Sequence, residues 1–524
     1  MADEVVRDDE LHGFMRQFRG FIDVTMQRFG EDEGEGEGLR AVLSEHVGAD
    51  AHRLPVVSES VPVHRVVDAD LALASLAEAD PGARLIGIAG DVRHHLTLAD
   101  LLQAGGSWGG RVRVGPVDYV QLPTGPRPED RRQVVSSGVH LFRFDDAPVV
   151  VRVQGVASQY GREEALVEVV AAERPVAEAL IDRVRALMDE RSVLRGQIIT
   201  FGFDPYGRGM AGITFVERPA LPAEDVVLPA GALERIRAHV VGIGEQREHL
   251  RAHGQHLKRG ILLYGAPGTG KTHTVRHLLS STPGTTAVLL SGGSLGHIHA
   301  AARVARAHQP AIVVLEDCDL IAEDRSFAMG PQPLLFEVLD TLDGLDADAD
   351  VAFLLTTNRV ADLEVALAQR PGRVDLAVEI PLPDEAGRLA LLQLYAARLF
   401  SDAALAAAAA RSEGTTASFV KELVRRAVLH AALAGRDPAD EHLASALDEL
   451  LSDSEVLTRS LLGVASSGAD GPAEGGPGTE GGSWPEGGSA SPGPVPVPRP
   501  GRMPGGYRGG RGFGWFDYGP RARG

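Results

Sequence analysis

The pattern of apolar and polar positions divides the chain into four regions. The first contains one helix-like segment and three short apolar runs typical of strands, at residues 11–29, 83–90, 139–144 and 148–155. A later segment, PVAEALIDRVRALMDE at 175–190, repeats its apolar residues at helical spacing. We therefore predict an N-terminal α+β domain over residues 1–225.

Longer apolar runs alternate with helix-like segments in the second region. They lie at residues 260–265, 286–292, 311–317 and 351–358. Runs of this kind indicate strands buried on both faces, as in a parallel sheet that helices cover on each side. A proline-rich segment at 217–231 precedes them. We predict an α/β domain over residues 226–382 and a smaller, all-helical domain over residues 383–462.

The last region, residues 463–524, consists mainly of glycine, proline and serine. Such a composition cannot bury enough apolar surface to fold, so we predict a disordered tail. Its segment YRGGRGFGWF at 507–516 resembles arginine–glycine segments that bind single-stranded nucleic acid. A flexible tail of biased composition is the favoured interpretation, and recruitment to nucleic acid stays open as an alternative.

Composition narrows the class of protein. The net charge of −20 does not favour a generic nucleic-acid binder. A single cysteine, Cys318, cannot form an intrachain disulfide and fits a reducing compartment. The charged start MADEVVRDDE does not resemble a signal peptide, and the sequence has no apolar run of membrane-spanning length. We therefore expect a cytoplasmic location without membrane insertion.

The segment GAPGTGKT, which follows the strand-like run GILLYG and precedes a helix-like segment, has the pattern of a phosphate-binding loop. Glycines let the backbone wrap around phosphates so that amide groups point at them. Lys271 is expected to bridge the β- and γ-phosphates of ATP, and the Thr272 hydroxyl to bind Mg²⁺. The predicted nucleotide-binding residues are Gly265, Ala266, Pro267, Gly268, Thr269, Gly270, Lys271 and Thr272.

Two adjacent acids, Glu316 and Asp317, end the apolar run at 311–317. Nucleotide hydrolysis at a phosphate loop needs one carboxylate for the metal and one for the attacking water. We assign Glu316 to the metal and Asp317 to the water.

In this order, the motifs resemble the AAA subgroup of AAA+ ATPases over roughly residues 226–450. In LLTTNR at 354–359, the resemblance implies that Asn358 senses the γ-phosphate. In ALAQRPGRVD at 366–375, it implies that Arg370 and Arg373 reach the nucleotide of a neighbouring subunit.

The segment GTTASFVKELVRRAVLHAAL at 414–433 resembles the family's lid helix beside the adenine and ribose. The resemblance implies an ATP hydrolase that uses Mg²⁺ and assembles as a ring, as hexamers in this family. Its ATP-driven motions would remodel a protein client, which we expect the N-terminal domain to recruit.

The chain departs from the family pattern at the acid pair. The usual order is Asp then Glu, whereas here Glu316 precedes Asp317. The reversed order resembles a mitochondrial AAA branch that translocates a folded iron–sulfur protein. A displacement of about 1 Å near the reacting atoms can lower the rate about a hundredfold. Hydrolysis is the favoured interpretation, and a nucleotide-gated scaffold with little hydrolysis is the alternative.

A second departure concerns the segment after the second strand, where family members that thread a client place an aromatic side chain. Here it reads SGGSLGHIHAAARVARAHQP at 291–310, without an aromatic residue. Leu295, His297 and Ile298 are the residues that could grip a client weakly. The sequence therefore favours remodelling of a client from the outside over threading.

Overall fold

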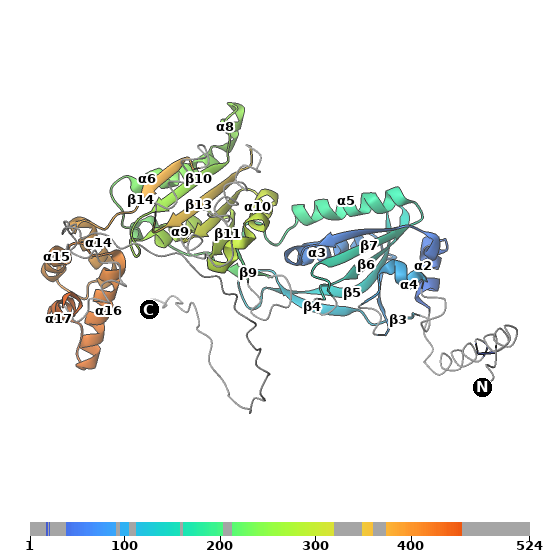
Figure 1. Ribbon diagram of the computed structural model, residues 1–524, viewed down its shortest axis with the longest axis horizontal. Coiled ribbons are helices and arrows are strands. Elements are labelled where there is room, and N and C mark those ends of the chain that lie inside the picture. The colour runs from blue at the N-terminus through green and yellow to red at the C-terminus, as the bar shows by residue number, and fades with distance from the viewer. Residues whose placement is uncertain are drawn as a thin grey trace, which may run out of the picture. The chain divides into compact units, whose positions relative to one another are not determined.

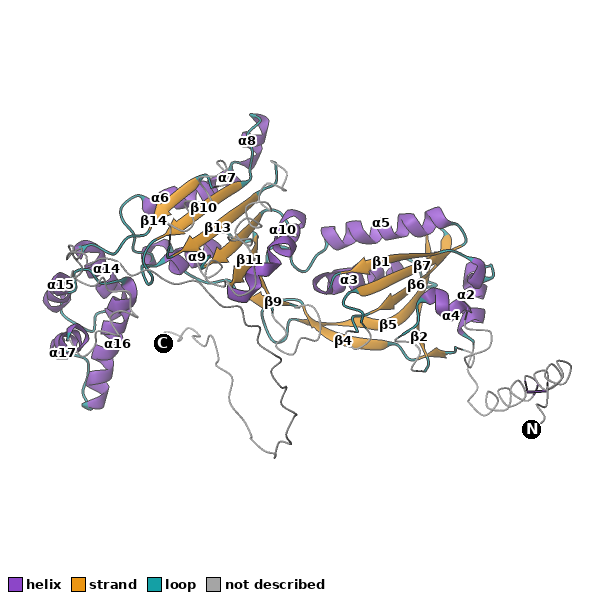
Figure 2. Cartoon of the chain, in the orientation of Figure 1, coloured by secondary structure: helices purple, strands orange, loops and turns teal. Residues whose placement is uncertain are grey.

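The computed structural model describes residues 17–18, 20, 38–90, 95–103, 112–157, 161–202, 212–318, 348–359 and 374–452. These residues form two sheets, each covered by helices, and a separate group of helices (Figure 1, Figure 2). The predicted α/β fold class with a helical lid and a preceding α+β region is confirmed. The tail and, apart from residues 17, 18 and 20, the predicted helix at 11–29 lie outside the described residues.

The first sheet is antiparallel, with strand order β1-β7-β6-β5-β2-β3 and β4 paired with the first half of β5. Its strands are β1 (Val56–Val61), β2 (Arg84–Ile88), β3 (Val114–Gly115), β4 (Asp118–Pro123), β5 (Arg131–Phe144), β6 (Ala147–Gln154) and β7 (Ala165–Ala171). Strands β2, β5 and β6 confirm the three predicted ones. The sequence analysis did not identify β1, β3, β4 or β7.

Helices cover both faces of this sheet. Helices α3 (Val66–Glu78) and α5 (Arg174–Glu190) pack on one face, and α2 (Leu39–Val47) and α4 (Leu98–Gln103) on the other. Strand β6 shows the two faces within three residues, because Val149 and Val151 belong to the α3–α5 core and Val150 to the α2–α4 core. The short helices η1 (Ala51–Arg53) and η2 (Val63–Arg65) connect neighbouring elements.

A buried ion pair stands inside the first sheet. The Arg152 guanidinium, with no exposed side-chain surface, lies 3.5 Å from a carboxylate oxygen of Glu168 and donates to the Leu96 carbonyl at 2.6 Å. Glu168 in turn accepts from the Leu98 N–H at 2.9 Å. Burial lowers the pKa of Arg152 to about 10 and raises that of Glu168. The pair therefore fixes the start of α4 against the sheet.

The second sheet has the strand order β14-β10-β13-β12-β11-β8-β9. Its strands are β8 (Ile198–Phe201), β9 (Ile213–Val216), β10 (Arg259–Tyr264), β11 (Thr286–Ser291), β12 (Ala311–Glu316), β13 (Val351–Thr357) and β14 (Leu376–Glu379). All neighbours pair in parallel except β8 and β9, which form an antiparallel hairpin. The four strands predicted between residues 260 and 358 are confirmed as β10, β11, β12 and β13.

The sheet includes residues on the N-terminal side of the predicted domain boundary at residue 225. Strand β8 pairs in parallel with β11, so residues 198–216 belong to the second sheet and not to the first. The boundary predicted at the proline-rich segment does not coincide with the edge of the sheet. A change in composition marks only neighbouring residues, whereas strand pairing joins residues far apart in the chain. In that segment Arg218 fastens the hairpin to the core by donating to the carbonyls of Gly196, Leu279, Thr282 and Thr285.

Two apolar layers cover the second sheet. Helix α10 (Ile298–Ala307) packs on one face with η7 (Gly292–His297), against side chains such as Val313 and Phe353. Helices α6 (Ala232–Arg237) and α9 (Lys271–Ser280) pack on the other face, against residues such as Val314. The remaining short helices before β10 are η5 (Ala223–Asp225), η6 (Ala238–Gly242), α7 (Ile243–Glu245) and α8 (Arg247–Ala252).

The helical region has a core of its own. Its helices are α14 (Glu385–Ala396), α15 (Asp402–Arg411), α16 (Ala417–Leu433) and α17 (Asp440–Leu451). In the proline-rich segment, Val227 packs against this helical core and Leu228 against the core of the second sheet. Across the described ranges, no helix is both long and apolar enough to cross a membrane.

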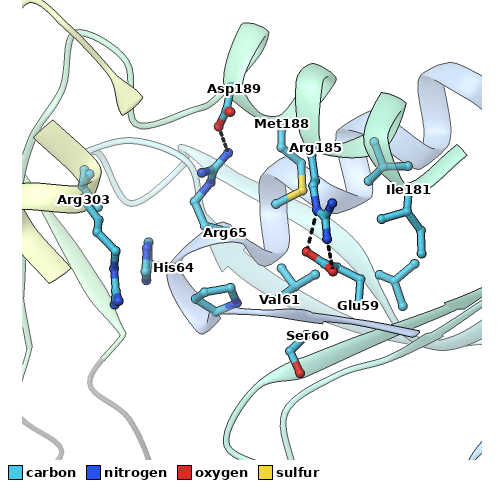
Figure 3. Close-up of a pocket in the computed structure, with 14 residues that line it drawn as sticks. Glu59, Ser60, Val61, His64, Arg65, Ile181, Arg185, Met188, Asp189 and Arg303 are labelled. Carbon is cyan, nitrogen blue, oxygen red and sulfur yellow. Dashed lines mark hydrogen bonds and ion pairs between the residues drawn. The ribbon is translucent and has the colours of Figure 1, made fainter. Parts of the chain in front are cut away.

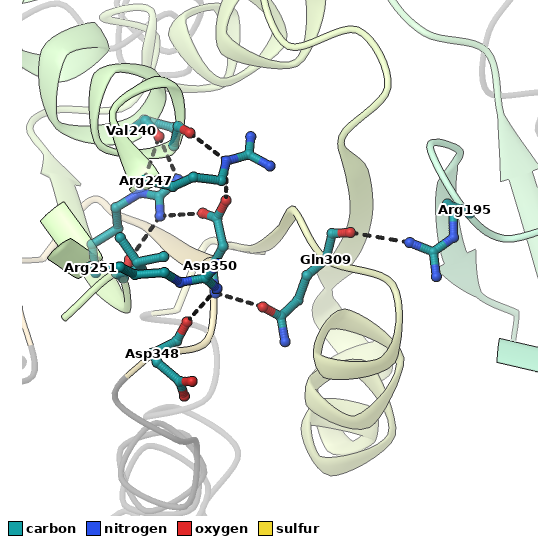
Figure 4. Close-up of polar contacts among 10 residues, drawn as sticks. Arg195, Val240, Arg247, Arg251, Gln309, Asp348 and Asp350 are labelled. Carbon is teal, nitrogen blue, oxygen red and sulfur yellow. Dashed lines mark hydrogen bonds and ion pairs between the residues drawn. The ribbon is translucent and has the colours of Figure 1, made fainter. Parts of the chain in front are cut away.

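A buried charge cluster lies where β10 and β13 begin (Figure 4). Arg259, 5% exposed, donates to the Asp350 carboxylate at 2.8 Å and to the Val240 and Leu257 carbonyls. Arg247 approaches the second oxygen of Asp350 at 3.4 Å, with 40% of its side chain exposed. Gln309 accepts from the Asp350 N–H at 2.7 Å. Asp350 therefore joins two strands and a helix.

We expect Asp350→Ala to lower the free energy of unfolding by about 3–5 kcal/mol, because it leaves the buried Arg259 charge without its partner. Arg247→Ala removes the exposed partner of the same carboxylate and is expected to cost about 1 kcal/mol or less. Urea unfolding followed by circular dichroism measures both. Equal losses for the two variants would show that burial of Arg259 does not govern the cluster.

Candidate functional site

The register of the parallel strands brings the predicted site residues to one edge of the second sheet. Strand β13 lies between β10 and β12, with Tyr264 opposite Thr357 and Leu315 opposite Leu355. The phosphate-loop segment follows β10, the acid pair ends β12, and Asn358 follows β13. Because parallel strands end at the same edge, these three segments are neighbours there.

The phosphate loop has a backbone that only glycine adopts easily. Gly265 has φ +149°, and a Cβ there would stand 2.2 Å from the Ile380 carbonyl oxygen. Gly268 has φ +78°, and its Cβ would stand 2.9 Å from the Ser418 hydroxyl oxygen. The loop is therefore confined between the strand end before the lid and the lid itself.

Lys271 begins α9 directly after the loop and is 6% exposed. Its ammonium donates to the carbonyls of Gly265 and Ala266, at 2.9 Å each. The Ala266 carbonyl also accepts from the Thr269 hydroxyl at 2.9 Å, while Pro267 stands exposed at the loop's outer turn. A buried cation enclosed by the loop, at the N-terminus of a helix, is suited to hold phosphate oxygens.

Thr272 of α9 and Glu316 at the end of β12 lie near each other, close enough for the Thr272 side chain to influence the charge of the Glu316 carboxylate. Burial raises the pKa of Glu316, the negative charge of Asp317 raises it further, and the contacts with Thr272 and Arg276 oppose the rise. A hydroxyl and a carboxylate oxygen near each other are ligands of the kind that Mg²⁺ takes, and a bound cation would offset the burial of Glu316. The pair therefore fits the predicted magnesium site.

Asp317 departs from the extended backbone of its strand. Its φ is +53°, in the left-handed region. Its N–H donates to the Thr356 hydroxyl at 3.0 Å, and the next N–H, of Cys318, donates to the Thr356 carbonyl at 2.9 Å. Thr356 is 1% exposed. The sequence analysis did not identify Thr356, since a threonine inside an apolar run gives no sign of what its hydroxyl binds.

The start of the lid helix α16 contacts the phosphate loop directly. The Ser418 N–H donates to the Gly268 carbonyl at 3.1 Å. Thr416 caps the helix by accepting from the Phe419 N–H at 3.2 Å. The resemblance implied a lid helix on the nucleotide's base and sugar side, and the structure adds this contact with the loop. Ser418 was not identified in the sequence either.

The remaining predicted residues are placed only in part. Asn358 is half-buried one residue beyond β13, directly after Thr357, which pairs with Tyr264 at the end of β10. Its role as a γ-phosphate sensor stays a prediction. Arg370 and Arg373 lie outside the described residues, so their predicted action across a subunit interface is untested.

Comparison with known proteins identifies the segment that contains this site. Residues 261–382 match the family model described as "ATPase family associated with various cellular activities (AAA)". This segment is an AAA domain. The resemblance noted from the phosphate loop, the acid pair and Asn358 is confirmed at the level of the family.

Three proteins are similar to this chain over a part that includes the AAA domain. An "ATP-dependent zinc metalloprotease FtsH" of Acidothermus cellulolyticus is 33% identical over 49% of this chain and 41% of its own length. A "26S proteasome regulatory subunit 10B" of Dictyostelium discoideum is 35% identical over 34% of this chain and 49% of its own. A "Proteasome-activating nucleotidase" of Methanocaldococcus jannaschii is 30% identical over 42% of this chain and 55% of its own.

The chain thus spans about half the length of the curated relatives it matches. The metalloprotease motif H-E-x-x-H is also absent from its sequence. The similarity therefore concerns the AAA domain and not the whole of any of these proteins.

We expect Gly265→Ala to abolish binding of a fluorescent ATP analogue in the presence of Mg²⁺. The added methyl would meet the Ile380 carbonyl oxygen at 2.2 Å and force the loop to move. Gly284→Ala is the matched control, because it also adds a side chain at positive φ (+79°) but in open space, within the turn between α9 and β11. The control should cost about 1–2 kcal/mol in stability and keep nucleotide affinity.

Proposed function

We propose that this protein is an ATPase that binds ATP with Mg²⁺ and hydrolyses it to ADP and phosphate. The observation behind the proposal is the buried Lys271 ammonium enclosed by the phosphate loop, with Thr272 and Glu316 near each other at the same sheet edge. It joins a phosphate-binding loop to a metal-binding pair at one sheet edge. Membership of the domain in the AAA family of ATPases supports the same activity.

Each side chain receives one task in this proposal. Lys271 neutralises the β- and γ-phosphates, while Thr272 and Glu316 hold Mg²⁺, which would offset negative charge on the phosphate oxygens. Asp317 orients and deprotonates the attacking water, and Asn358 contacts the γ-phosphate. These assignments rest on the residues' places at the sheet edge and on the family resemblance.

We propose further that the chain works as a ring, with six subunits as the resemblance implies. Arg370 or Arg373 of one subunit would then stabilise the charge that develops on the phosphate bound by its neighbour. An arginine supplied in this way accelerates phosphoryl transfer by about 10³–10⁵. The printed names of two relatives, a proteasome regulatory subunit and a proteasome-activating nucleotidase, are compatible with work on protein clients.

The N-terminal region is the proposed site for a protein client, and remodelling from the outside is favoured over threading. Leu295 and Ile298, two of the residues that could grip a threaded client weakly, are 2% and 0% exposed in the core of the second sheet. Their burial speaks against a gripping role for these two. The His297 ring stacks on Phe201 at 5.4 Å between ring centroids.

The N-terminal region also contacts β8 and the residue that follows α10. The His64 ring meets the edge of Phe201 at 5.9 Å, and the Ser192 hydroxyl lies 3.3 Å from His308 at the end of α10. A cavity of about 280 Å³ is lined by Arg303 and Val304 of α10 and by residues of β1, β7, η2 and α5, His64 among them (Figure 3). A cavity beside α10 is compatible with movement of this helix against the first sheet.

The arginine–glycine tail lies outside the described residues. Recruitment to nucleic acid through it therefore has no structural observation in its favour. The cytoplasmic location likewise stays a prediction.

Steady-state ATP hydrolysis, measured against protein concentration, tests the proposal. We expect turnover per subunit to rise with concentration as rings assemble. Asp317→Asn should lower it at least about a hundredfold by removing the proton acceptor. Arg373→Ala should lower it by a similar factor at every concentration, because the neighbour's nucleotide loses its cation.

The alternative is a scaffold that binds ATP and scarcely hydrolyses it. It would give equal, near-background turnover in the wild type and in both variants while the fluorescent ATP analogue still binds.

A further inference from the structure

The unusual order of the acid pair coincides with an unusual backbone. Asp317, the second acid, has φ +53° in the left-handed region, whereas Glu316 before it ends the extended strand β12. Among residues other than glycine, asparagine and aspartate adopt this region most readily. Glutamate has no such preference. The residue type at position 317 therefore matches the conformation that the fold imposes there.

The turn interrupts the hydrogen bonding between β12 and β13, and one residue on β13 accepts both displaced bonds. The Thr356 hydroxyl accepts from the Asp317 N–H at 3.0 Å, and the Thr356 carbonyl accepts from the Cys318 N–H at 2.9 Å. Thr356 is 1% exposed, so no solvent competes for either acceptor. A buried N–H without an acceptor is costly, and these bonds therefore hold the turn.

The turn also changes what the second acid can reach. Along an extended strand, successive side chains point to opposite faces of the sheet. Glu316 lies near Thr272 at the end of the phosphate loop, and in continued strand geometry residue 317 would point to the opposite face of the sheet from Glu316. A left-handed residue breaks this alternation. Backbone rotation can then bring the shorter aspartate into place where other sequences use a longer side chain.

We propose that Thr356 is a positioning residue that holds Asp317 in its left-handed conformation for ATP hydrolysis, and that this conformation explains the Glu–Asp order. The inference rests on the proposed function, because it assigns Asp317 to the attacking water. It adds a requirement at a residue of the LLTTNR segment to which the resemblance assigns no role. It also implies that Asp317→Glu, although it keeps the charge, does not improve the enzyme.

The test compares Thr356→Val with Thr356→Ser in single-turnover and steady-state hydrolysis at a concentration where the wild type is active. Valine has the shape of threonine but offers no hydroxyl acceptor. We expect Thr356→Val to lower kcat about 10–100-fold, the penalty of a displacement near 1 Å, with KM and the affinity for the fluorescent ATP analogue within about twofold. Thr356→Ser keeps the acceptor and should stay within about threefold of the wild type in kcat.

A double-mutant cycle shows whether Thr356 acts through Asp317. Asparagine tolerates the left-handed region, so Asp317→Asn removes the carboxylate and keeps the turn. If the inference holds, adding Thr356→Val to Asp317→Asn lowers the residual rate no further. Asp317→Glu should lower kcat at least about tenfold.

Several outcomes would overturn the inference while the proposed function stands. One is an unchanged kcat in Thr356→Val, and another is a Thr356→Ser enzyme as slow as Thr356→Val. A third is that Thr356→Val lowers kcat by the same factor in the Asp317→Asn variant as in the wild type. The last is an Asp317→Glu enzyme that is faster than the wild type. Loss of nucleotide affinity together with turnover in Thr356→Val would also overturn it, because Thr356 would then support the whole loop. Absence of turnover in the wild type would instead overturn the proposed function itself.

Discussion

The parallel register of β10, β13 and β12 is the constraint on which the site depends. It sets Tyr264 opposite Thr357 and Leu315 opposite Leu355, so that three loops leave the sheet at the same level. Both faces of these strands are buried by helices, and their side chains between the ends are accordingly apolar. A slip of one residue would exchange the two faces and separate the phosphate loop from the acids. The packing of apolar side chains inside the domain thus determines which functional residues meet at the edge of the sheet.

Contacts with the lid extend this constraint beyond the sheet. The first turn of α16 donates a backbone hydrogen bond to the phosphate loop through Ser418. In the proline-rich segment, Val227 packs against the core of the helical region and its neighbour Leu228 against the core of the second sheet. A change in lid position therefore acts on the loop that would hold the phosphates. It also acts on the segment that leads into α6. Nucleotide contacts and lid position are consequently linked by hydrogen bonding and by chain connection.

The sequence predicts the features of this molecule that depend on local pattern. Apolar runs identify β10 to β13, and GAPGTGKT identifies the loop with its lysine. Features that depend on distant partners escape such analysis. Strand β8 joins the second sheet through β11, more than eighty residues away in the chain. Arg152 and Glu168 interrupt valine-rich strands as surface charges would, yet they are buried together. The left-handed backbone at Asp317 and its partner Thr356 cannot be read from an acid pair.

The β8–β9 hairpin has a consequence for how the AAA domain can exist alone. By pairing with β11, β8 covers the backbone N–H and C=O groups on that strand's outer side, and Arg218 fixes the following segment. A fragment beginning at residue 226, where composition marks the proline-rich boundary, would lack both strands. Its β11 would then present an unpaired, apolar edge suited to pair with strands of other molecules. The tendency of the isolated ATPase region to aggregate therefore depends on residues that precede the segment matched by the family model.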